Sequence, residues 1–100
     1  MRRARFIEPA RREYLEQLDW YARSGAGLAA RFAKEVEDAT ARALEFPFAG
    51  APIHPGARRC LLRRFPFLLI YQVEDGGIAV LALAHQSRQP EFWVDRMGGA

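Results

Sequence analysis

Two apolar runs joined by a glycine-containing turn constrain the fold of this chain more than any other feature. The runs are Phe67–Val73 and Ile78–Ala84, and the segment Glu74-Asp75-Gly76-Gly77 joins them. Leu, Ile, Val, Phe and Tyr dominate the first run and Ile, Val, Leu and Ala the second. Each run is about seven residues long, and this length and β-branched content favour strands over helices. Asp-Gly and Gly-Gly permit the positive φ angles of a tight hairpin turn. The sequence therefore predicts an antiparallel hairpin.

Both faces of this hairpin are apolar. Strict alternation places one set of first-strand side chains on one face (Phe67, Leu69, Tyr71 and Val73) and another set opposite (Leu68, Ile70 and Gln72). In the second strand, alternation places one set on one face (Ile78, Val80, Ala82 and Ala84) and the other set on the opposite face (Ala79, Leu81, Leu83 and His85). Such strands need cover on both sides. Two helices cover one face and the Phe92-Trp93 segment part of the other, so an exposed apolar patch is expected to remain as a surface for a protein partner.

Two amphipathic helices precede the hairpin. Pro9 suits the first turn of a helix over residues 9–23, and Gly25 is placed to end it in a left-handed conformation. The apolar stripe of the second helix, over residues 28–46, consists of Leu28, Phe32, Val36, Ala39, Ala43 and Phe46. Pro47 ends that helix, and the short turn between the helices makes them an antiparallel pair.

The remaining elements are short. Ala4–Glu8 and Arg58–Leu62 are predicted strands, and the segment between Phe48 and Ala57, with two Pro and two Gly, is a predicted loop. The expected order is β-α-α-β-β-β, an α+β fold in which a two-helix hairpin packs on a mostly antiparallel four-stranded sheet. Residues 1–100 form one domain.

The composition restricts the cellular compartment and the kinds of functional site that are expected for this chain. The longest uncharged stretches are shorter than the roughly 20 apolar residues of a membrane helix, and the basic start lacks the apolar core of a signal peptide. The single cysteine, Cys60, fits a reducing cytoplasm and a small buried role. His54 stands alone in the predicted loop, and we identify no metal site, no phosphate-binding glycine loop and no cofactor requirement.

The positive charge is unevenly distributed. The net charge is +3, with +2 in residues 1–9, −1 in residues 10–46 and +2 in residues 47–100. The excess therefore belongs to the first strand and the hairpin half, where it predicts an anionic partner, either acidic protein or nucleic acid. A general RNA-binding module is the weakest of these interpretations, because +3 is small for a wide basic surface.

The hairpin and its flanks resemble a known family. The features that carry the resemblance follow one another along the chain. They are Arg-Arg-Phe-Pro-Phe from Arg63, Ile70-Tyr71 with Val73, the glycine turn, Ala84-His85 with Arg88 and Pro90, Phe92-Trp93, and a closing Arg96. Together they are similar to the RelE/ParE toxins of bacterial toxin–antitoxin operons, and a weaker similarity extends over the helices.

The resemblance implies a protein partner. Toxins of this kind are held inactive by a co-expressed antitoxin whose extended, often acidic C-terminal segment wraps the toxin. In this chain the expected antitoxin-binding residues are helix-one side chains and one arginine before the hairpin: Tyr14, Leu18, Trp20, Tyr21 and Arg63. Trp20 lies off the helix-one stripe, so it either packs on a neighbouring element or anchors the partner chain.

Two activities are compatible with the resemblance. RelE-like toxins cleave messenger RNA on the ribosome, which here would use His85 as acid or base, Arg64 and Arg88 on the phosphate, and Trp93 as a stacking surface. ParE-like toxins inhibit DNA gyrase and need only a complementary surface. This chain lacks the sheet lysines and C-terminal tyrosine typical of the ribonucleases, so it is closer to the ParE-like branch.

Under that interpretation the target-binding residues are Arg64, His85, Arg88, Trp93 and Arg96. Each also has a purely structural alternative. His85 could be hydrogen-bonded at the end of its strand, the arginines could brace the fold, and Phe92-Trp93 could cover the core. The sequence leaves these alternatives open.

Overall fold

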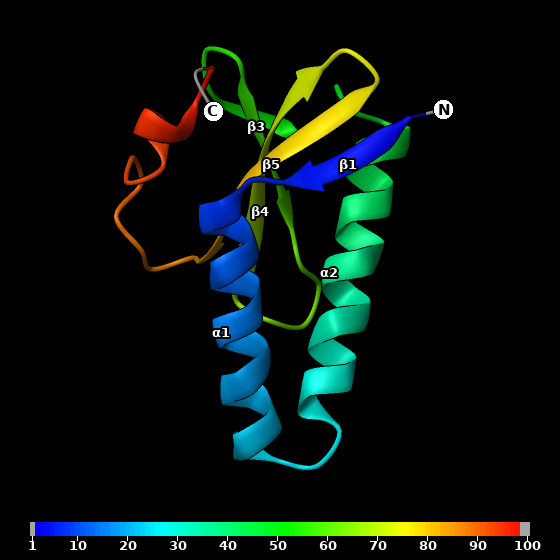
Figure 1. The fold of residues 1–100 in the computed structure, drawn as a ribbon, viewed down its shortest axis with the longest axis vertical. Coiled ribbons are helices and arrows are strands. Elements are labelled where there is room, and N and C mark those ends of the chain that lie inside the picture. Colours follow the sequence, from blue (N-terminus) through cyan, green and yellow to red (C-terminus); the bar gives the residue numbers. More distant parts are fainter. Residues whose placement is uncertain (1, 99–100) are drawn as a thin grey trace.

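The computed structural model describes residues 2–98 of the chain (Figure 1). The helices are α1 (Glu8–Ser24) and α2 (Leu28–Glu45), and a single 3₁₀ turn, η1 (Val94–Arg96), lies near the C-terminus. The strands are β1 (Arg3–Phe6), β2 (Ala51–His54), β3 (Ala57–Leu61), β4 (Phe67–Glu74) and β5 (Gly77–His85).

The strands form one sheet in the order β1-β5-β4-β3-β2, with β1 parallel to β5 and all other neighbours antiparallel. The predicted α+β class, the helical hairpin and the mostly antiparallel sheet are confirmed. The predicted strand count was one too low, because Ala51–His54 lies in the segment expected to be a loop. Pro52 is tolerated there because β2 is an edge strand, whose outward side needs no backbone donor.

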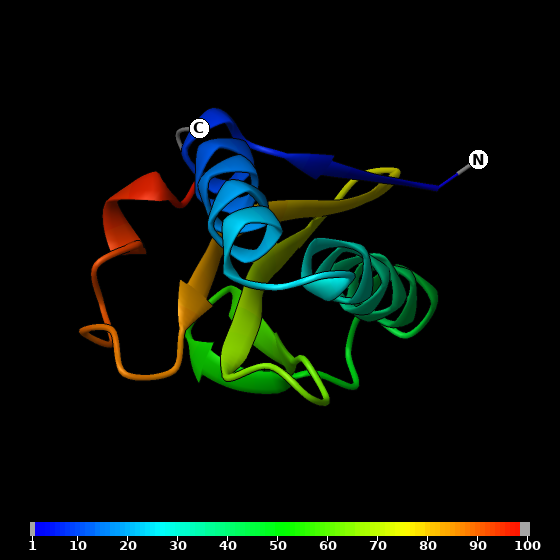
Figure 2. The same ribbon diagram turned by 90° about the horizontal axis from the view of Figure 1, so that it is seen from below.

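The helices cover one face of the sheet, and the C-terminal segment lies on the other, as Figure 2 shows. Most of the predicted α2 stripe is buried: Phe32, Val36, Ala39 and Ala43. Phe46, the last member, lies beyond the helix end and is exposed. The left-handed glycine between the helices is Gly27, at φ 77°, while Gly25 is extended at φ 176°. The prediction for Gly25 was therefore wrong, because the reversal occurs where α2 begins.

A bulge in β5 changes which residues share a face. Ile70 pairs with Ala82 but Tyr71 pairs with Val80, so Leu81 is the extra residue. Paired residues in an antiparallel ladder lie on the same face. Strict alternation was therefore wrong for β5, since the side chains beyond the bulge change sides relative to those before it. The helix-facing set combines Ile78 and Val80 with Leu83 and His85.

The opposite face of the hairpin is covered more completely than the sequence predicted. The β5 residues from Ile78 to Ala84 are all buried, and Trp93 is buried with them. Exposed apolar side chains remain at the margins of the sheet, at Ile53, Leu61 and Val73. Among the described residues of the hairpin, Val73 is the one exposed large apolar side chain, so the expected apolar patch is reduced to a single position. Neither helix in residues 2–98 is both long and apolar enough to cross a membrane.

Gly77 allows β1 to approach β5. Its φ is 151°, and a Cβ atom there would collide with the backbone of Arg3, including its carbonyl oxygen. Gly76 has φ 81° but open space around its Cβ position. Both glycines thus occupy conformations that favour glycine, but only Gly77 is also in close backbone contact.

We expect Gly77→Ala to destabilise the chain more than Gly76→Ala. Gly76→Ala should lower the free energy of unfolding by about 1 kcal/mol, the strain of an L-residue at positive φ. Gly77→Ala has the same strain and also forces β1 away from β5, so it should lower the free energy of unfolding by about 2–4 kcal/mol. Urea unfolding of both variants measures the difference, and equal losses would contradict the close contact of β1 with Gly77.

Candidate functional site

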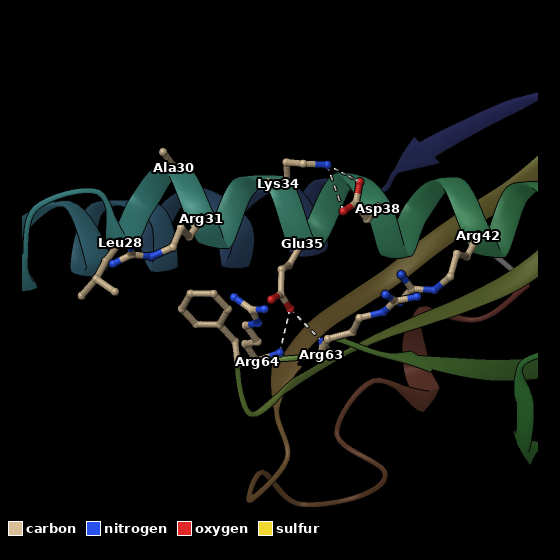
Figure 3. Close-up of a pocket in the computed structure, with 10 residues that line it drawn as sticks. Leu28, Ala30, Arg31, Lys34, Glu35, Asp38, Arg42, Arg63 and Arg64 are labelled. Atoms are coloured by element: carbon tan, nitrogen blue, oxygen red, sulfur yellow. Dashed lines mark hydrogen bonds and ion pairs between the residues drawn. The ribbon is translucent and has the colours of Figure 1, made fainter.

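A basic groove lies between α2 and the loop that joins β3 to β4 (Figure 3). Its volume is about 760 Å³. Five basic side chains, two carboxylates and three apolar residues line it: Arg31, Lys34, Arg42, Arg63, Arg64, Glu35, Asp38, Leu28, Ala30 and Phe65. Because the basic residues outnumber the acidic ones and apolar side chains lie among them, the groove suits a ligand that is both anionic and partly apolar.

Both carboxylates of the groove bind partners within the chain. Glu35 Oε1 accepts hydrogen bonds from the backbone N–H groups of Arg63, at 2.7 Å, and Arg64, at 2.9 Å. Asp38 is paired with Lys34 one turn earlier, at 3.0 Å. Glu35 therefore fixes the loop backbone without neutralising either loop guanidinium group.

The arginine side chains of the groove differ in the hydrogen bonds and ion pairs that they make. Arg42 donates to the carbonyl of Leu61 at 3.1 Å, and Figure 3 shows Arg42 and Arg63 extending toward each other. The guanidinium groups of Arg31, Arg63 and Arg64 make no ion pair with any carboxylate in residues 2–98. They are the charges available to an anionic ligand.

A second cavity of about 360 Å³ lies on the opposite side of the sheet, under the C-terminal segment. Its lining includes Arg88, Phe92 and Trp93, together with Arg59 from β3. It also reaches His85 at the end of β5, although the His85 ring packs edge-on against helix-facing Phe67, with 5.3 Å between centroids. Arg64 does not line it. Of the predicted target-binding residues, Arg64 lines the groove on the α2 side, three line this cavity (His85, Arg88 and Trp93), and Arg96 lines neither.

Trp93 is part of the core. Its side chain is 1% exposed, its indole N–H donates to the Pro90 carbonyl at 2.8 Å, and its ring packs edge-on against His54 with 5.7 Å between centroids. The buried ring cannot serve as an open stacking surface. Of the two alternatives in the sequence, the structure therefore places Trp93 in the core-covering role.

Arg96 is bound to Glu13 of α1, a residue that the sequence did not single out. Two guanidinium nitrogens contact the two carboxylate oxygens at 3.0 Å each, and Nη1 also donates to the Leu81 carbonyl at 2.9 Å. Glu13 in turn accepts the backbone N–H of Leu83 at 3.2 Å. Both side chains are largely buried, 19% and 15% exposed. The arrangement assigns Arg96 a bracing role between α1, β5 and η1.

His85 and Arg88 are the more accessible members of the predicted set. The Arg88 guanidinium lies 3.8 Å from the centre of the Phe92 ring and 3.5 Å from Glu13. His85 is exposed, and its Nδ1 accepts the backbone N–H of Ser87 at 3.0 Å. The neutral imidazole therefore carries its proton on Nε2. These two residues can contact a ligand with little rearrangement.

The predicted antitoxin-binding residues are also separated. Tyr14, Leu18 and Tyr21 are partly buried against the core, and burial raises the pKa of both tyrosine hydroxyls. Trp20 is 55% exposed on the outer side of α1, and Arg63 lines the basic groove. Only Trp20 and Arg63 of this set present their side chains openly. Among residues 2–98, no cluster of three or more His, Cys, Asp or Glu side chains is arranged to hold a metal ion.

The sequence matches the family described as the ParE toxin of the type II toxin–antitoxin system parDE over residues 4–90. The chain belongs to the ParE toxin family. The match includes both helices and every strand residue except Arg3, and it ends before η1. A search of curated proteins found no match. The resemblance identified from the hairpin motifs is thereby confirmed at the level of the family.

The ion pair between Glu13 and Arg96 should be a major source of stability in this ParE-family chain. Glu13→Gln leaves a mostly buried guanidinium without its counter-charge, so we expect the free energy of unfolding to fall by about 2–4 kcal/mol. Glu16→Gln, an exposed position on the same helix, is the control and should change it by less than about 0.5 kcal/mol. Equal urea midpoints for the two variants would refute the bracing role.

Proposed function

We propose that this chain is a toxin neutralised by a cognate antitoxin, and that an acidic C-terminal segment of the antitoxin binds in the basic groove. The supporting observation is the set of three guanidinium groups, from Arg31, Arg63 and Arg64, that have no carboxylate partner in residues 2–98. Carboxylates can engage them bidentately, which adds geometric specificity to the charge attraction.

The groove favours a protein segment over nucleic acid. Leu28 and Phe65 provide apolar contacts beside the arginines, and an acidic helix or extended segment with apolar anchors matches both features. A nucleic-acid surface would be expected to carry a wider basic area than the net charge of +3 supplies.

For the free toxin we propose inhibition of DNA gyrase. Cleavage of RNA through a 2′-hydroxyl needs a base, an acid and charge stabilisation at the phosphate. Among the residues that line the second cavity, His85 is the one histidine and Glu91 the one carboxylate, and arginine stays protonated. An inhibitor needs only a complementary surface, to which the half-exposed Arg88 can supply charge.

Messenger RNA cleavage is the second candidate. The observation in its favour is that His85 lines the same cavity as Arg59 and Arg88. The two guanidinium groups could bind and polarise a phosphate, and the second proton-transfer group would have to come from Glu91, which lines the same cavity, or from the ribosome.

Antitoxin binding should depend on the groove arginines. With the product of the neighbouring gene as ligand, we expect Arg63→Glu to weaken binding by at least about tenfold, because one favourable charge contact becomes a repulsive one. Arg12→Glu makes the same change on an exposed part of α1 outside the groove and should leave the dissociation constant within about twofold. Calorimetric titration measures both. Identical affinities for the two variants would exclude the groove as the binding site.

The two activities are separated by assaying the free chain in parallel on gyrase supercoiling and on ribosome-bound messenger RNA. We expect inhibited supercoiling, partial loss with Arg88→Ala, and little loss with His85→Ala. An enzyme would instead lose about 10²–10⁴-fold with His85→Ala, the usual contribution of a general acid or base. Codon-positioned cuts in the messenger RNA, with supercoiling unaffected, would overturn the proposal.

A further inference from the structure

The face of the sheet opposite the helices is open along β3. The Cys60 thiol donates to a main-chain carbonyl of α2 at 3.6 Å, so the neighbouring side chains of Arg59 and Leu61 point to the other face. Leu61 pairs with Leu68 of β4, and Arg59 pairs with Ile70. Because paired residues share a face, these four side chains lie together on the side of the C-terminal segment.

Burial on this face decreases from β5 toward β2. Ile70 and Ala84, which line the cavity under the C-terminal segment, are buried, Leu68 is partly buried, and Leu61 is exposed. Ile53 of β2 lines the same cavity as Leu68 and is also exposed. The C-terminal segment therefore leaves an apolar margin uncovered, on β3 and β2 instead of the hairpin. We call this area the β3 face and define it by four residues: Ile53, Arg59, Leu61 and Leu68.

Arg59 supplies an unpaired charge on the β3 face. Its side chain is exposed, and it lines both the cavity of about 360 Å³ and a neighbouring hollow of about 390 Å³. Its guanidinium group makes no ion pair with a carboxylate of residues 2–98, including Glu91 in the same cavity. The guanidinium group of Arg58 donates to two main-chain carbonyls, at 2.8 and 2.9 Å. Arg58 is thus bound within the chain, whereas Arg59 is available to a partner.

The chemistry of the β3 face fits a protein surface. A guanidinium group beside aliphatic side chains can bind a carboxylate while the neighbouring apolar groups exclude water. Single-stranded RNA is held largely by stacking of its bases on aromatic side chains. The apolar residues of the β3 face are all aliphatic, and Trp93 of the adjoining cavity is buried. The face therefore favours a protein partner that carries an acidic group next to apolar ones.

We propose that DNA gyrase contacts the toxin at the β3 face, with a gyrase carboxylate on Arg59 and apolar gyrase side chains against Leu61 and Ile53. The inference rests on the proposed function, because it takes gyrase as the target. It adds to the target-binding set two residues that the sequence did not single out, Arg59 and Leu61. Arg88 lines the same cavity as Arg59 and borders the proposed contact.

The β3 face and the basic groove are distinct but adjacent. No residue of the β3 face lines the groove. Arg42 of α2 lines both the groove and the hollow of about 390 Å³ that Arg59 also lines. Gyrase and the antitoxin would therefore bind different residues, and an antitoxin segment that extends past Arg42 would block the approach of gyrase to the β3 face.

Charge reversal tests the contribution of Arg59. We expect Arg59→Glu to raise the toxin concentration that half-inhibits gyrase supercoiling by at least about tenfold, because an attractive contact becomes a repulsive one. Arg12→Glu makes the same change on an exposed part of α1 and should alter that concentration by less than about twofold. Both variants should bind the neighbouring gene product like the wild type, since neither residue lines the groove.

Leu61 has a matched control in Leu15 of α1, because both side chains are 46% exposed. Leu61→Glu should also weaken the inhibition of gyrase by at least about tenfold, since placing a carboxylate in an apolar contact is unfavourable. Leu15→Glu should leave the inhibition unchanged. Thermal unfolding of the four free variants verifies that each retains the fold.

Photocrosslinking gives a measurement that does not depend on lost activity. A benzophenone-bearing amino acid in place of Leu61 should crosslink to gyrase when the mixture is irradiated. The same replacement of Leu15 should give no crosslink.

The outcomes separate this inference from the proposed function. If Arg59→Glu and Leu61→Glu inhibit gyrase as strongly as the wild type, or position 61 gives no crosslink, the β3 face is refuted while gyrase inhibition stands. If the wild-type chain leaves supercoiling unimpaired, both fail. If the two variants bind the antitoxin more weakly but inhibit gyrase fully, the face belongs to the antitoxin. If the wild-type chain instead cuts messenger RNA and Arg59→Glu does not, the face belongs to RNA.

Discussion

The ion pair between Glu13 and Arg96 connects parts of the chain that are far apart in sequence. β1 ends at Phe6, opposite Val80, and the Leu81 carbonyl and Leu83 N–H of β5 are bound by these two side chains. Burying two charges is unfavourable unless their remaining hydrogen-bonding groups are satisfied. Here the bidentate contact and the β5 backbone satisfy them. The pair therefore holds α1 against the β5 bulge and anchors η1, which keeps Trp93 on the second face of the sheet.

The same principle determines which positive charges remain available. Arg96 is paired with Glu13, Arg5 with Glu74 and Lys34 with Asp38. Glu35 instead binds the backbone N–H groups of the loop, and so it positions Arg63 and Arg64 without pairing with their guanidinium groups. The basic groove thus follows from a carboxylate that stabilises the loop backbone. A toxin surface kept unpaired in this way is suited to an acidic inhibitor that must be recognised and later released.

Helix α2 borders two separate surfaces of the molecule. α2 packs against β1 as well as β3, although these strands are separated by β5 and β4 in the sheet. Its buried stripe faces the core, one flank meets the β3–β4 loop and the other meets the open edge of β1. The first flank is basic, whereas the second flank borders a cleft lined by Phe6, Tyr14 and Leu44, in which Glu37 is the one charged side chain. The two surfaces therefore differ in charge although they share α2.

The sequence by itself determined the two helices, the β4–β5 hairpin, the α+β class and the family, because each depends on local periodicity, turn residues or ordered motifs. It also led to the prediction that Arg63 binds a partner, and the structure places Arg63 in the basic groove. It could not predict the β5 bulge, since a bulge depends on backbone pairing with other strands, and one extra residue moves the following side chains to the opposite face. Nor could it separate the bracing Arg96 from the unpaired Arg31, Arg63 and Arg64. All four are arginines in similar surroundings along the chain, and the carboxylate that binds Arg96 lies 83 residues away. Only the tertiary structure decides which charges are neutralised, because ion pairing depends on distance in space.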